Sequence, residues 1–131
     1  LIRILTQLTA QLRPHIPDLR KAYQYLGLLD FIRAKGQLAH RLEATLPTLH
    51  PRPLLRWKQV RHPLLYLTFQ NHPKDDPREV VPLDIELTPE QRILLISGPN
   101  AGGKSVSMKT VGLVQYMLQC GLLIPAGDGS E

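Results

Sequence analysis

The chain has 131 residues, of which 43% are hydrophobic and 21% charged, and this length suits one modest domain or parts of two. No stretch approaches the roughly 18 consecutive apolar residues of a membrane span, no basic-then-apolar secretion signal opens the sequence, and a single cysteine excludes a disulfide scaffold. The net charge of +5 is unevenly distributed along the chain. Residues 1–61 carry eleven Lys and Arg against three Asp and Glu, and residues 62–131 carry five against eight. Such a distribution is typical either of contact with a polyanion or of a solvated basic helix face.

Two helices are predicted in the first part of the chain. Residues 1–13 carry apolar side chains at helical spacing, and Pro14 and Pro17 are expected to end this helix. Asp18 offers a capping oxygen to a second, longer helix, which Pro47 ends. One stripe of the second helix is apolar and steps by three and four residues, as on a face that packs against a partner. This stripe comprises Ala22, Leu26, Leu29, Ile32, Gly36, Ala39, Leu42 and Leu46.

Short strands and turns are predicted next, because nine of the twelve prolines fall within residues 47–99. The segment PLLYLTF (63–69) is predicted to be a strand. The segment LDIEL (83–87) alternates apolar and acidic residues, which indicates a half-exposed strand, and a Thr-Pro-Glu turn follows it. The segment ILLIS (93–97) begins with four apolar residues, as in a strand buried on both faces of a parallel sheet. The sequence thus changes near residue 50 from helical and basic to sheet-containing.

The last part of the chain returns to a helical pattern over residues 106–120, and Gly121 can adopt the left-handed conformation that ends a helix. Cys120 lies in the apolar pattern and is expected to be a small core residue in a reducing cytosol. The final five residues, GDGSE (127–131), close no element and are expected to be unstructured. The sequence therefore has the character of an excerpt from a longer protein.

The segment GPNAGGKS satisfies the pattern of Gly, four residues, then Gly-Lys-Ser. Its glycines are required because backbone N–H groups wrap the phosphates of a nucleotide closely, and a Cβ atom at these positions would obstruct them. The lysine is expected to contact the β- and γ-phosphates, and the serine hydroxyl to ligate Mg²⁺. An apolar run before the motif and an amphipathic helix after it are the context that the motif requires. The predicted phosphate-binding residues are Gly98, Pro99, Asn100, Ala101, Gly102, Gly103, Lys104 and Ser105.

Binding of a nucleotide does not establish its hydrolysis. A dinucleotide-binding turn would need Gly-x-Gly-x-x-Gly followed by an acidic residue about 20 positions later, and the sequence has no such triplet. Hydrolysis of the γ-phosphate needs a carboxylate on a second strand, but after Lys104 the carboxylates are Asp128 and Glu131. No catalytic residue is therefore assigned, and a nucleotide-gated binding or scaffold protein that never hydrolyses ATP stays an alternative.

The motif and its surroundings resemble the ATPase domain of the MutS family. That family's loop has the form Gly-Pro-Asn-x-Gly-Gly-Lys-Ser/Thr and is followed by Ile/Val-Pro-Ala, matched here by residues 124–126. The segment RHPLL (61–65) resembles the start of the ATPase domain, and VVPLDIEL (80–87) resembles the strand before the loop. The segment YLGLLDFIRAKGQLA (25–39) is similar to one arm of the long lever helices.

The resemblance implies an α/β fold, the N-terminal portion of an ABC-like P-loop NTPase preceded by a helical lever segment. Residues 1–50 would end the lever domain and residues 51–131 would begin the ATPase domain. It also implies ATP and Mg²⁺ as cofactors, with Ser105 as the metal ligand, and places Asn100 near the γ-phosphate. Val80 and Val81 would contact adenine. The implied partners are double-stranded DNA and a second copy bound through the ATPase domains, in the cytoplasm and without a membrane.

Two kinds of MutS protein are distinguished by their domains and loops. One kind recognises mismatched DNA, and the other is a paralogue that lacks the mismatch-reading domain and carries a C-terminal Smr nuclease domain. Ala101, Val106 and the segment GLLDFIRAKG resemble the second kind. This implies ATP binding and hydrolysis coupled to DNA clamping, in an endonuclease that restrains recombination or handles stalled ribosomes. The mismatch-repair ATPase is the alternative. The resemblance also implies an acidic pair for Mg²⁺ and the attacking water, which this chain lacks, so the chain alone is expected to be inactive.

Two further side chains could contact a nucleic acid or a nucleotide. Trp57, between Arg56 and Lys58, could stack on a base, although a lone tryptophan in such a segment more often packs in a core. His62 could contact the nucleotide, although a role in a turn is commoner. The remaining histidines share no metal-ligand spacing and are expected at the surface. They are His15, His40, His50 and His72.

Overall fold

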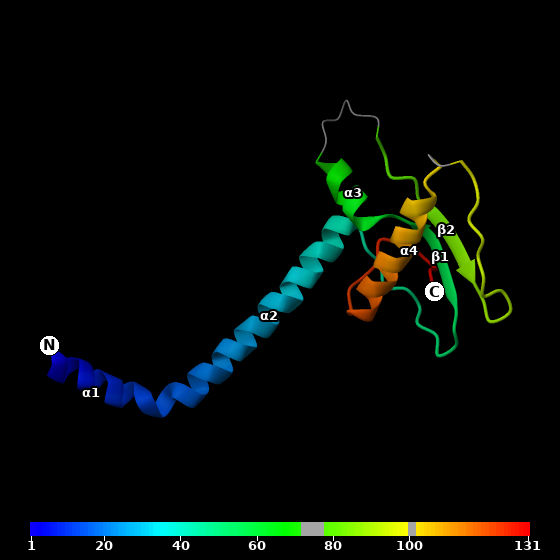
Figure 1. Cartoon of the computed structure of the whole chain (residues 1–131). Helices are drawn as coiled ribbons and strands as arrows, with labels where there is room; N and C mark the ends of the chain where they lie inside the picture. Colours follow the sequence, from blue (N-terminus) through cyan, green and yellow to red (C-terminus); the bar gives the residue numbers. More distant parts are fainter. Residues whose placement is uncertain (72–77, 100–101) are drawn as a thin grey trace. The chain divides into compact units, whose positions relative to one another are not determined.

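The computed structural model describes residues 1–71, 78–99 and 102–131 (Figure 1). The elements are α1 (Ile2–Leu12), a 3₁₀ helix (Arg13–His15), α2 (Ile16–Leu42), β1 (Leu55–Val60), α3 (Pro63–Gln70), β2 (Leu83–Leu87) and α4 (Lys104–Gln119). The chain divides into two compact units, Leu1–Gly36 and Gln37–Glu131. The division lies within α2, and the predicted lever and ATPase domains, 1–50 and 51–131, stay a prediction about a larger fold.

The first unit is helical throughout, as the sequence predicts. Pro14 lies in the 3₁₀ helix that separates α1 from α2. Pro17, however, does not interrupt the chain: α2 begins at Ile16, because the fixed φ of proline suits the first turn of a helix. Asp18 therefore lies within that first turn and is not the N-cap, where its charge still favours the helix dipole. No side chain of residues 1–36 is buried, so the predicted apolar stripe has no covering partner within this unit.

The second unit contains an antiparallel sheet of β1 and β2, with Trp57 opposite Ile85 and Val60 opposite Leu83. The prediction of β2 is confirmed, since Ile85 is buried while its acidic neighbours are exposed. The strand β1 was not predicted. A bulge between Trp57 and Val60 places Gln59 at a φ of 52°, and its N–H donates to the Asp84 carboxylate over 2.6 Å. This extra residue breaks the alternation from which a strand is recognised.

The C-terminal residues are ordered, and the prediction that 127–131 are unstructured is wrong. The N–H of Glu131 donates to the Arg56 carbonyl over 2.7 Å, and the Arg56 N–H donates back over 2.8 Å. Ser130 is buried, and its hydroxyl accepts from the Lys58 N–H and donates to the Gly127 carbonyl. This segment satisfies backbone groups along one edge of β1 that would otherwise lack partners, which is a long-range pairing without a local signal.

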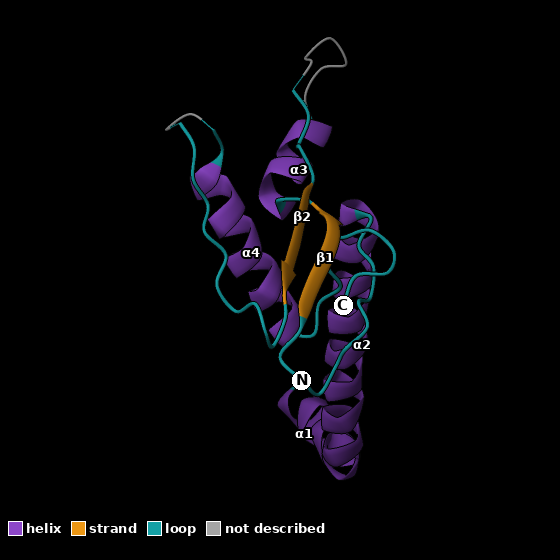
Figure 2. Ribbon diagram, turned by 90° about the vertical axis from the view of Figure 1, so that its right-hand side faces the viewer, coloured by secondary structure: helices purple, strands orange, loops and turns teal. Residues whose placement is uncertain are grey.

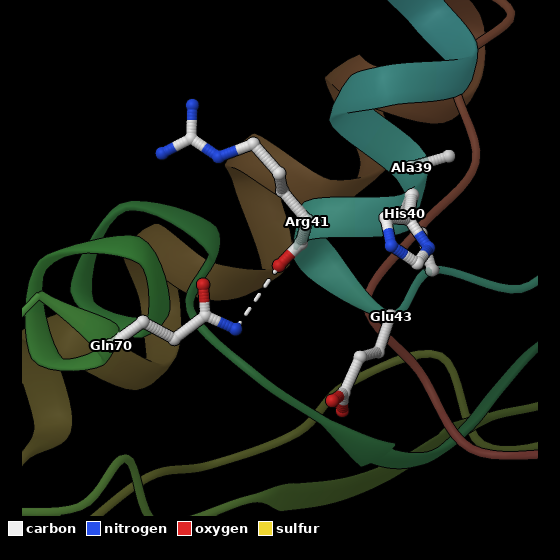
Figure 3. A pocket seen from close by; sticks show the side chains of 6 residues that line it. Ala39, His40, Arg41, Glu43 and Gln70 are labelled. Carbon is white, nitrogen blue, oxygen red and sulfur yellow. Dashed lines mark hydrogen bonds between the residues drawn. The ribbon is translucent and has the colours of Figure 1, made fainter.

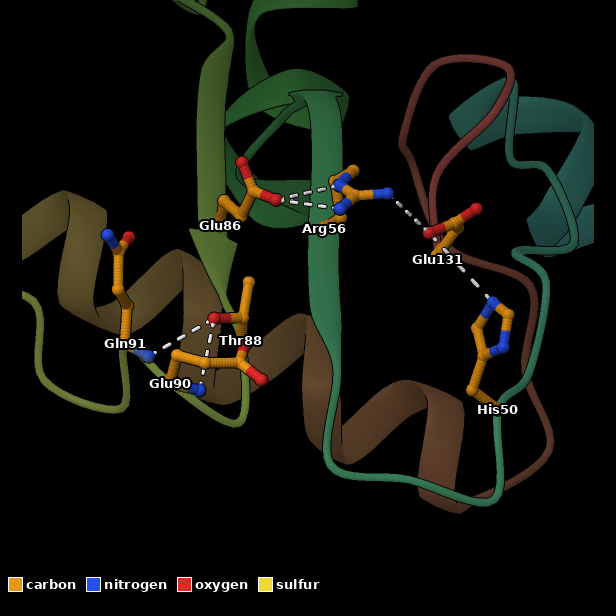
Figure 4. A network of polar contacts seen from close by, with 7 residues as sticks. All are labelled: His50, Arg56, Glu86, Thr88, Glu90, Gln91 and Glu131. Carbon is orange, nitrogen blue, oxygen red and sulfur yellow. Dashed lines mark hydrogen bonds and ion pairs between the residues drawn. The ribbon is translucent and has the colours of Figure 1, made fainter.

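A charged network on the surface reinforces this pairing (Figure 4). The Arg56 guanidinium contacts the Glu86 carboxylate on β2 at 2.8 Å and the Glu131 carboxylate at 2.8 Å. Glu131 also lies 3.9 Å from the His50 imidazole. In the same view, the predicted Thr-Pro-Glu turn is confirmed, because the Thr88 hydroxyl accepts from the N–H groups of Glu90 and Gln91. Arg56 thus joins three segments of the second unit.

The helix α4 lies beside the sheet of β1 and β2 (Figure 2). The buried apolar side chains form one cluster that joins α2, the sheet, α4 and the segment after α4. Trp57 is 2% exposed, which confirms the expectation that it packs in a core. The prediction of α4 is also confirmed, with Gly121 at a φ of 69° after its end. The cluster comprises Leu42, Trp57, Val60, Ile85, Val114, Met117, Ile124 and Ala126.

Residues 63–69 form the helix α3, so the predicted strand is wrong. Pro63 occupies the first turn, and the His62 imidazole caps the helix by accepting from the Leu65 N–H. A seven-residue apolar run is too short for periodicity to decide between strand and helix. Here the cap and proline favour the helix, and Tyr66 and Leu67 pack against the core cluster.

Two other expectations are wrong. Residues 93–97 do not form a strand, and Leu95 is 87% exposed. A strand of a parallel sheet needs hydrogen-bonded neighbours, and no described residue pairs with this segment. Cys120 is exposed because it lies at the end of α4, one position beyond the last helical residue.

Among the described residues, no helix combines the length and the low polarity that a membrane crossing demands.

Replacing Trp57 tests the core. We expect Trp57→Ala to lower the free energy of unfolding by about 3–5 kcal/mol, since a fully buried large side chain is lost. Tyr116→Ala, at a 65% exposed position on α4, is the control and should change it by less than about 0.5 kcal/mol. Urea unfolding followed by circular dichroism measures both, and equal effects would contradict the assigned core.

Candidate functional site

Two glycines of the predicted phosphate loop have backbone conformations that L residues rarely adopt. Gly98 has a φ of 142° and Gly103 a φ of 77°. The Gly102 N–H donates to the Pro99 carbonyl over 3.0 Å, and a Cβ atom on Gly102 would lie 3.1 Å from that same oxygen. The loop is thus a tight turn in which glycine is required. It leads directly into α4, which begins at Lys104.

Lys104 folds back over the loop. Its ammonium donates to the carbonyl oxygens of Gly98 and Pro99. These two hydrogen bonds hold the positive charge of Lys104 beside the first residues of the loop. Ser105 is exposed in the first turn of α4, and its role as a Mg²⁺ ligand stays a prediction. Asn100 and Ala101 lie outside the described residues.

A cavity of about 410 Å³ adjoins the loop. One wall comes from the loop and the first turns of α4, and the other comes from the end of β1, α3 and the segment before β2. The lining is mostly apolar, with a few polar groups, as in a typical small-molecule site. Its described residues are Val60, His62, Leu65, Phe69, Glu79, Val80, Val81, Pro82, Leu83, Gly102, Gly103, Val106, Ser107 and Thr110.

The structure therefore places Val80 and Val81 in one cavity with Gly102 and Gly103, four residues that the sequence assigned to the two ends of a nucleotide. Gly98, Pro99, Lys104 and Ser105 do not line this cavity, although Lys104 contacts the first two. The cavity thus combines two glycines of the loop on one wall with mostly apolar side chains on the other.

His62 and Phe69 are lining residues whose position the sequence did not predict. Phe69 was assigned to a strand, and only the helical geometry of α3 brings it to the same cavity as His62. The signal for His62 was local: a residue before a proline at the start of a helix is a candidate cap. Burial, and to a smaller extent the charge of Lys109, lowers the pKa of His62 below its ordinary 6.5. The imidazole in this cavity is thus favoured in its neutral form.

Arg61 connects the cavity wall to the end of α2. Its guanidinium donates to the Glu43 carboxylate over 3.1 Å and to the Leu42 carbonyl over 3.4 Å, and lies 4.0 Å from the centre of the Tyr66 ring. A hydrogen bond from Tyr66, and then Arg61, lowers the pKa of Glu43. Since His62, the next residue, caps α3, these contacts of Arg61 join the start of α3 to the end of α2.

A second hollow, of about 510 Å³, lies at this junction of α2 and α3 (Figure 3). The Gln70 side-chain amide donates to the Arg41 carbonyl over 3.1 Å, while the Arg41 guanidinium points away from His40 and Glu43. None of the phosphate-loop residues that the structure describes lines this hollow, and its walls are two helix ends joined by a hydrogen bond. We therefore assign it to packing between elements rather than to a ligand.

Comparison with known proteins gives consistent matches. No protein-family model matches the chain. The chain is 45% identical over 129 residues to Endonuclease MutS2 of Geobacillus sp. (strain WCH70), 43% identical over 129 residues to that of Geobacillus thermodenitrificans (strain NG80-2), and 41% identical over 128 residues to that of Levilactobacillus brevis. Each match covers 98% of this chain and 15% of the relative, so the chain spans a small part of these proteins. The predicted resemblance is confirmed.

Two glycines next to and within α4 provide a matched test of the loop. Gly103→Ala should lower the free energy of unfolding by about 1–2 kcal/mol, because a φ of 77° strains an L residue. Gly112→Ala, in the middle of α4 with nothing within 4 Å of its added Cβ, should raise it by about 0.5–1 kcal/mol. Urea unfolding measures both, and effects of the same sign would contradict the left-handed turn.

The histidine predicts a pH dependence. Since folding lowers the pKa of His62 below 6.5, the unfolded chain binds this proton more readily than the folded one. The stabilisation is present above pH 6.5 and decreases as the pH falls below that value. In the variant His62→Asn, which can keep the cap through its side-chain oxygen, this part of the decrease should disappear. Thermal unfolding between pH 7.5 and 5 measures it, and parallel curves would refute the assignment.

Proposed function

Because the chain is homologous over nearly its whole length to a segment of the proteins named Endonuclease MutS2, we propose that it is the ATP-phosphate-binding segment of a MutS-type enzyme that acts on DNA. The observation that carries this proposal is the cavity that joins the phosphate-loop glycines to Val80 and Val81. The loop would hold the phosphates, Lys104 would contact the β- and γ-phosphates, and Ser105 would ligate Mg²⁺. The fold proposed for the larger protein is the P-loop NTPase fold.

The proposed function of the whole protein is ATP binding and hydrolysis coupled to DNA clamping, in an endonuclease that suppresses recombination. The names of the relatives favour the endonuclease over the mismatch-repair ATPase. The action on DNA, the homodimer formed through ATPase domains and the action on stalled ribosomes all belong to this proposal. The carboxylate that hydrolysis needs on a second strand after the loop would come from residues outside this chain.

The bond between Arg61 and the end of α2 could couple nucleotide binding to α2. α2 carries basic side chains, among them Arg33 and Lys35, and its last turn is bonded to Arg61 beside the cavity. A change of α3 on nucleotide binding would therefore move the end of α2 through the Arg61 contacts. A non-hydrolysing scaffold protein would share this route, so hydrolysis is what distinguishes the two functions.

The test is the affinity of the intact protein for MgATP. We expect Lys104→Ala to weaken binding roughly 10- to 100-fold, because the charged contact to the phosphates is lost. The control Lys21→Ala removes the same charge from the first unit and should leave the affinity unchanged. Isothermal titration calorimetry measures both, with circular dichroism to verify folding. Unchanged affinity in Lys104→Ala would refute the phosphate loop, and binding without any ATP turnover by the intact protein would favour the scaffold.

A further inference from the structure

The cavity beside the phosphate loop has polar groups whose hydrogen bonds can be followed one by one. The Ser107 hydroxyl donates to the Gly103 carbonyl over 3.2 Å, and the Thr110 hydroxyl donates to the Val106 carbonyl over 2.8 Å. Both hydroxyl protons are therefore engaged within α4. These two side chains offer the cavity only lone pairs, which accept hydrogen bonds and do not donate them.

The imidazole of His62 is different. Its Nδ1 accepts from the Leu65 N–H over 3.4 Å, so in the neutral ring the proton is on Nε2. Burial keeps this neutral form favoured, as its lowered pKa indicates. His62 is thus a described lining residue whose side chain has an N–H to donate. The helix cap sets the orientation of its ring.

His62 also belongs to the part of the wall where a base would lie. The phosphate-loop glycines belong to the wall formed by the loop and α4, whereas His62 comes from the wall that contains Phe69, Val80 and Val81. Those side chains are apolar and suit the faces of an aromatic ring. A purine between them would present its ring nitrogens, which are hydrogen-bond acceptors, at its edge.

We propose that His62 is a specificity-determining residue that donates a hydrogen bond from Nε2 to a ring nitrogen of the bound purine. This inference rests on the proposed nucleotide binding and adds a residue for base recognition to the loop that binds the phosphates. The helix cap serves the recognition, because the bond from Leu65 sets both the tautomer and the direction of the ring.

The experiment compares two ligands on the intact protein by isothermal titration calorimetry. MgATP has phosphates and a base, whereas magnesium tripolyphosphate has phosphates alone. The variant is His62→Asn, whose side-chain oxygen can keep the cap on Leu65 while no group remains at the position of Nε2. The matched control is Leu64→Ala, an exposed residue of the same helix turn that does not line the cavity.

We expect His62→Asn to weaken MgATP binding about three- to tenfold, the range of one hydrogen bond, and to leave tripolyphosphate binding unchanged. Leu64→Ala should change neither. Equal MgATP affinity in His62→Asn and the unaltered protein would overturn the inference, and so would an equal loss for both ligands, which would mean that His62 acts on the loop or fold. If the unaltered protein binds neither ligand, the proposed function itself is wrong.

ATP analogues with carbon in place of N1, N3 or N7 identify the acceptor. One of them should bind the unaltered protein about three- to tenfold more weakly than ATP, with no further loss in His62→Asn, because the same hydrogen bond is removed from either side. If all three analogues bind the unaltered protein as ATP does, no ring nitrogen accepts from His62 and the inference is overturned.

Discussion

The second unit depends on the pairing of the segment after α4 with two other parts of the chain. On one side, Thr45 and Ile124 exchange backbone hydrogen bonds of 2.8 and 3.1 Å. On the other side, the Arg61 N–H donates to the Pro125 carbonyl over 2.9 Å, and the Gly127 N–H donates to the Lys58 carbonyl over 2.7 Å. Ile124 is fully buried between these pairings. Backbone groups that would otherwise be buried without partners are thereby satisfied, and the end of α2 is joined to β1.

The candidate site follows from this arrangement. The bond from Arg61 to Pro125 determines where β1 leaves the sheet, and Pro63 then starts α3 two residues later. α3 and the end of β1 form one wall of the cavity, while α4, held in the core by Val114 and Met117, supplies the other. The loop and the residues proposed to contact the base are thus brought together by a core that contains none of the described phosphate-loop residues.

Local sequence patterns correctly predicted the elements whose burial pattern and caps are encoded within their own residues. The alternation in β2 and the helical spacing in α4 are confirmed, as is the left-handed Gly121. Predictions were wrong where a partner decides the outcome. Residues 93–97 have a strand's composition, but no described residue pairs with them, and the pairing of 127–131 with β1 joins residues about 70 positions apart, beyond any local pattern.

The sequence by itself was sufficient to predict a phosphate loop, because its signal is local: three glycines, a lysine and a serine at fixed spacing. Gly103 has a left-handed φ of 77°, and the Lys104 ammonium donates to the Gly98 carbonyl of the loop. Only the tertiary structure decided what faces that loop. The helical state of residues 63–70, and with it the presence of His62 and Phe69 in the cavity, depends on packing against a core assembled from five distant segments. Such contacts are long-range in the sequence, and no local spacing encodes them.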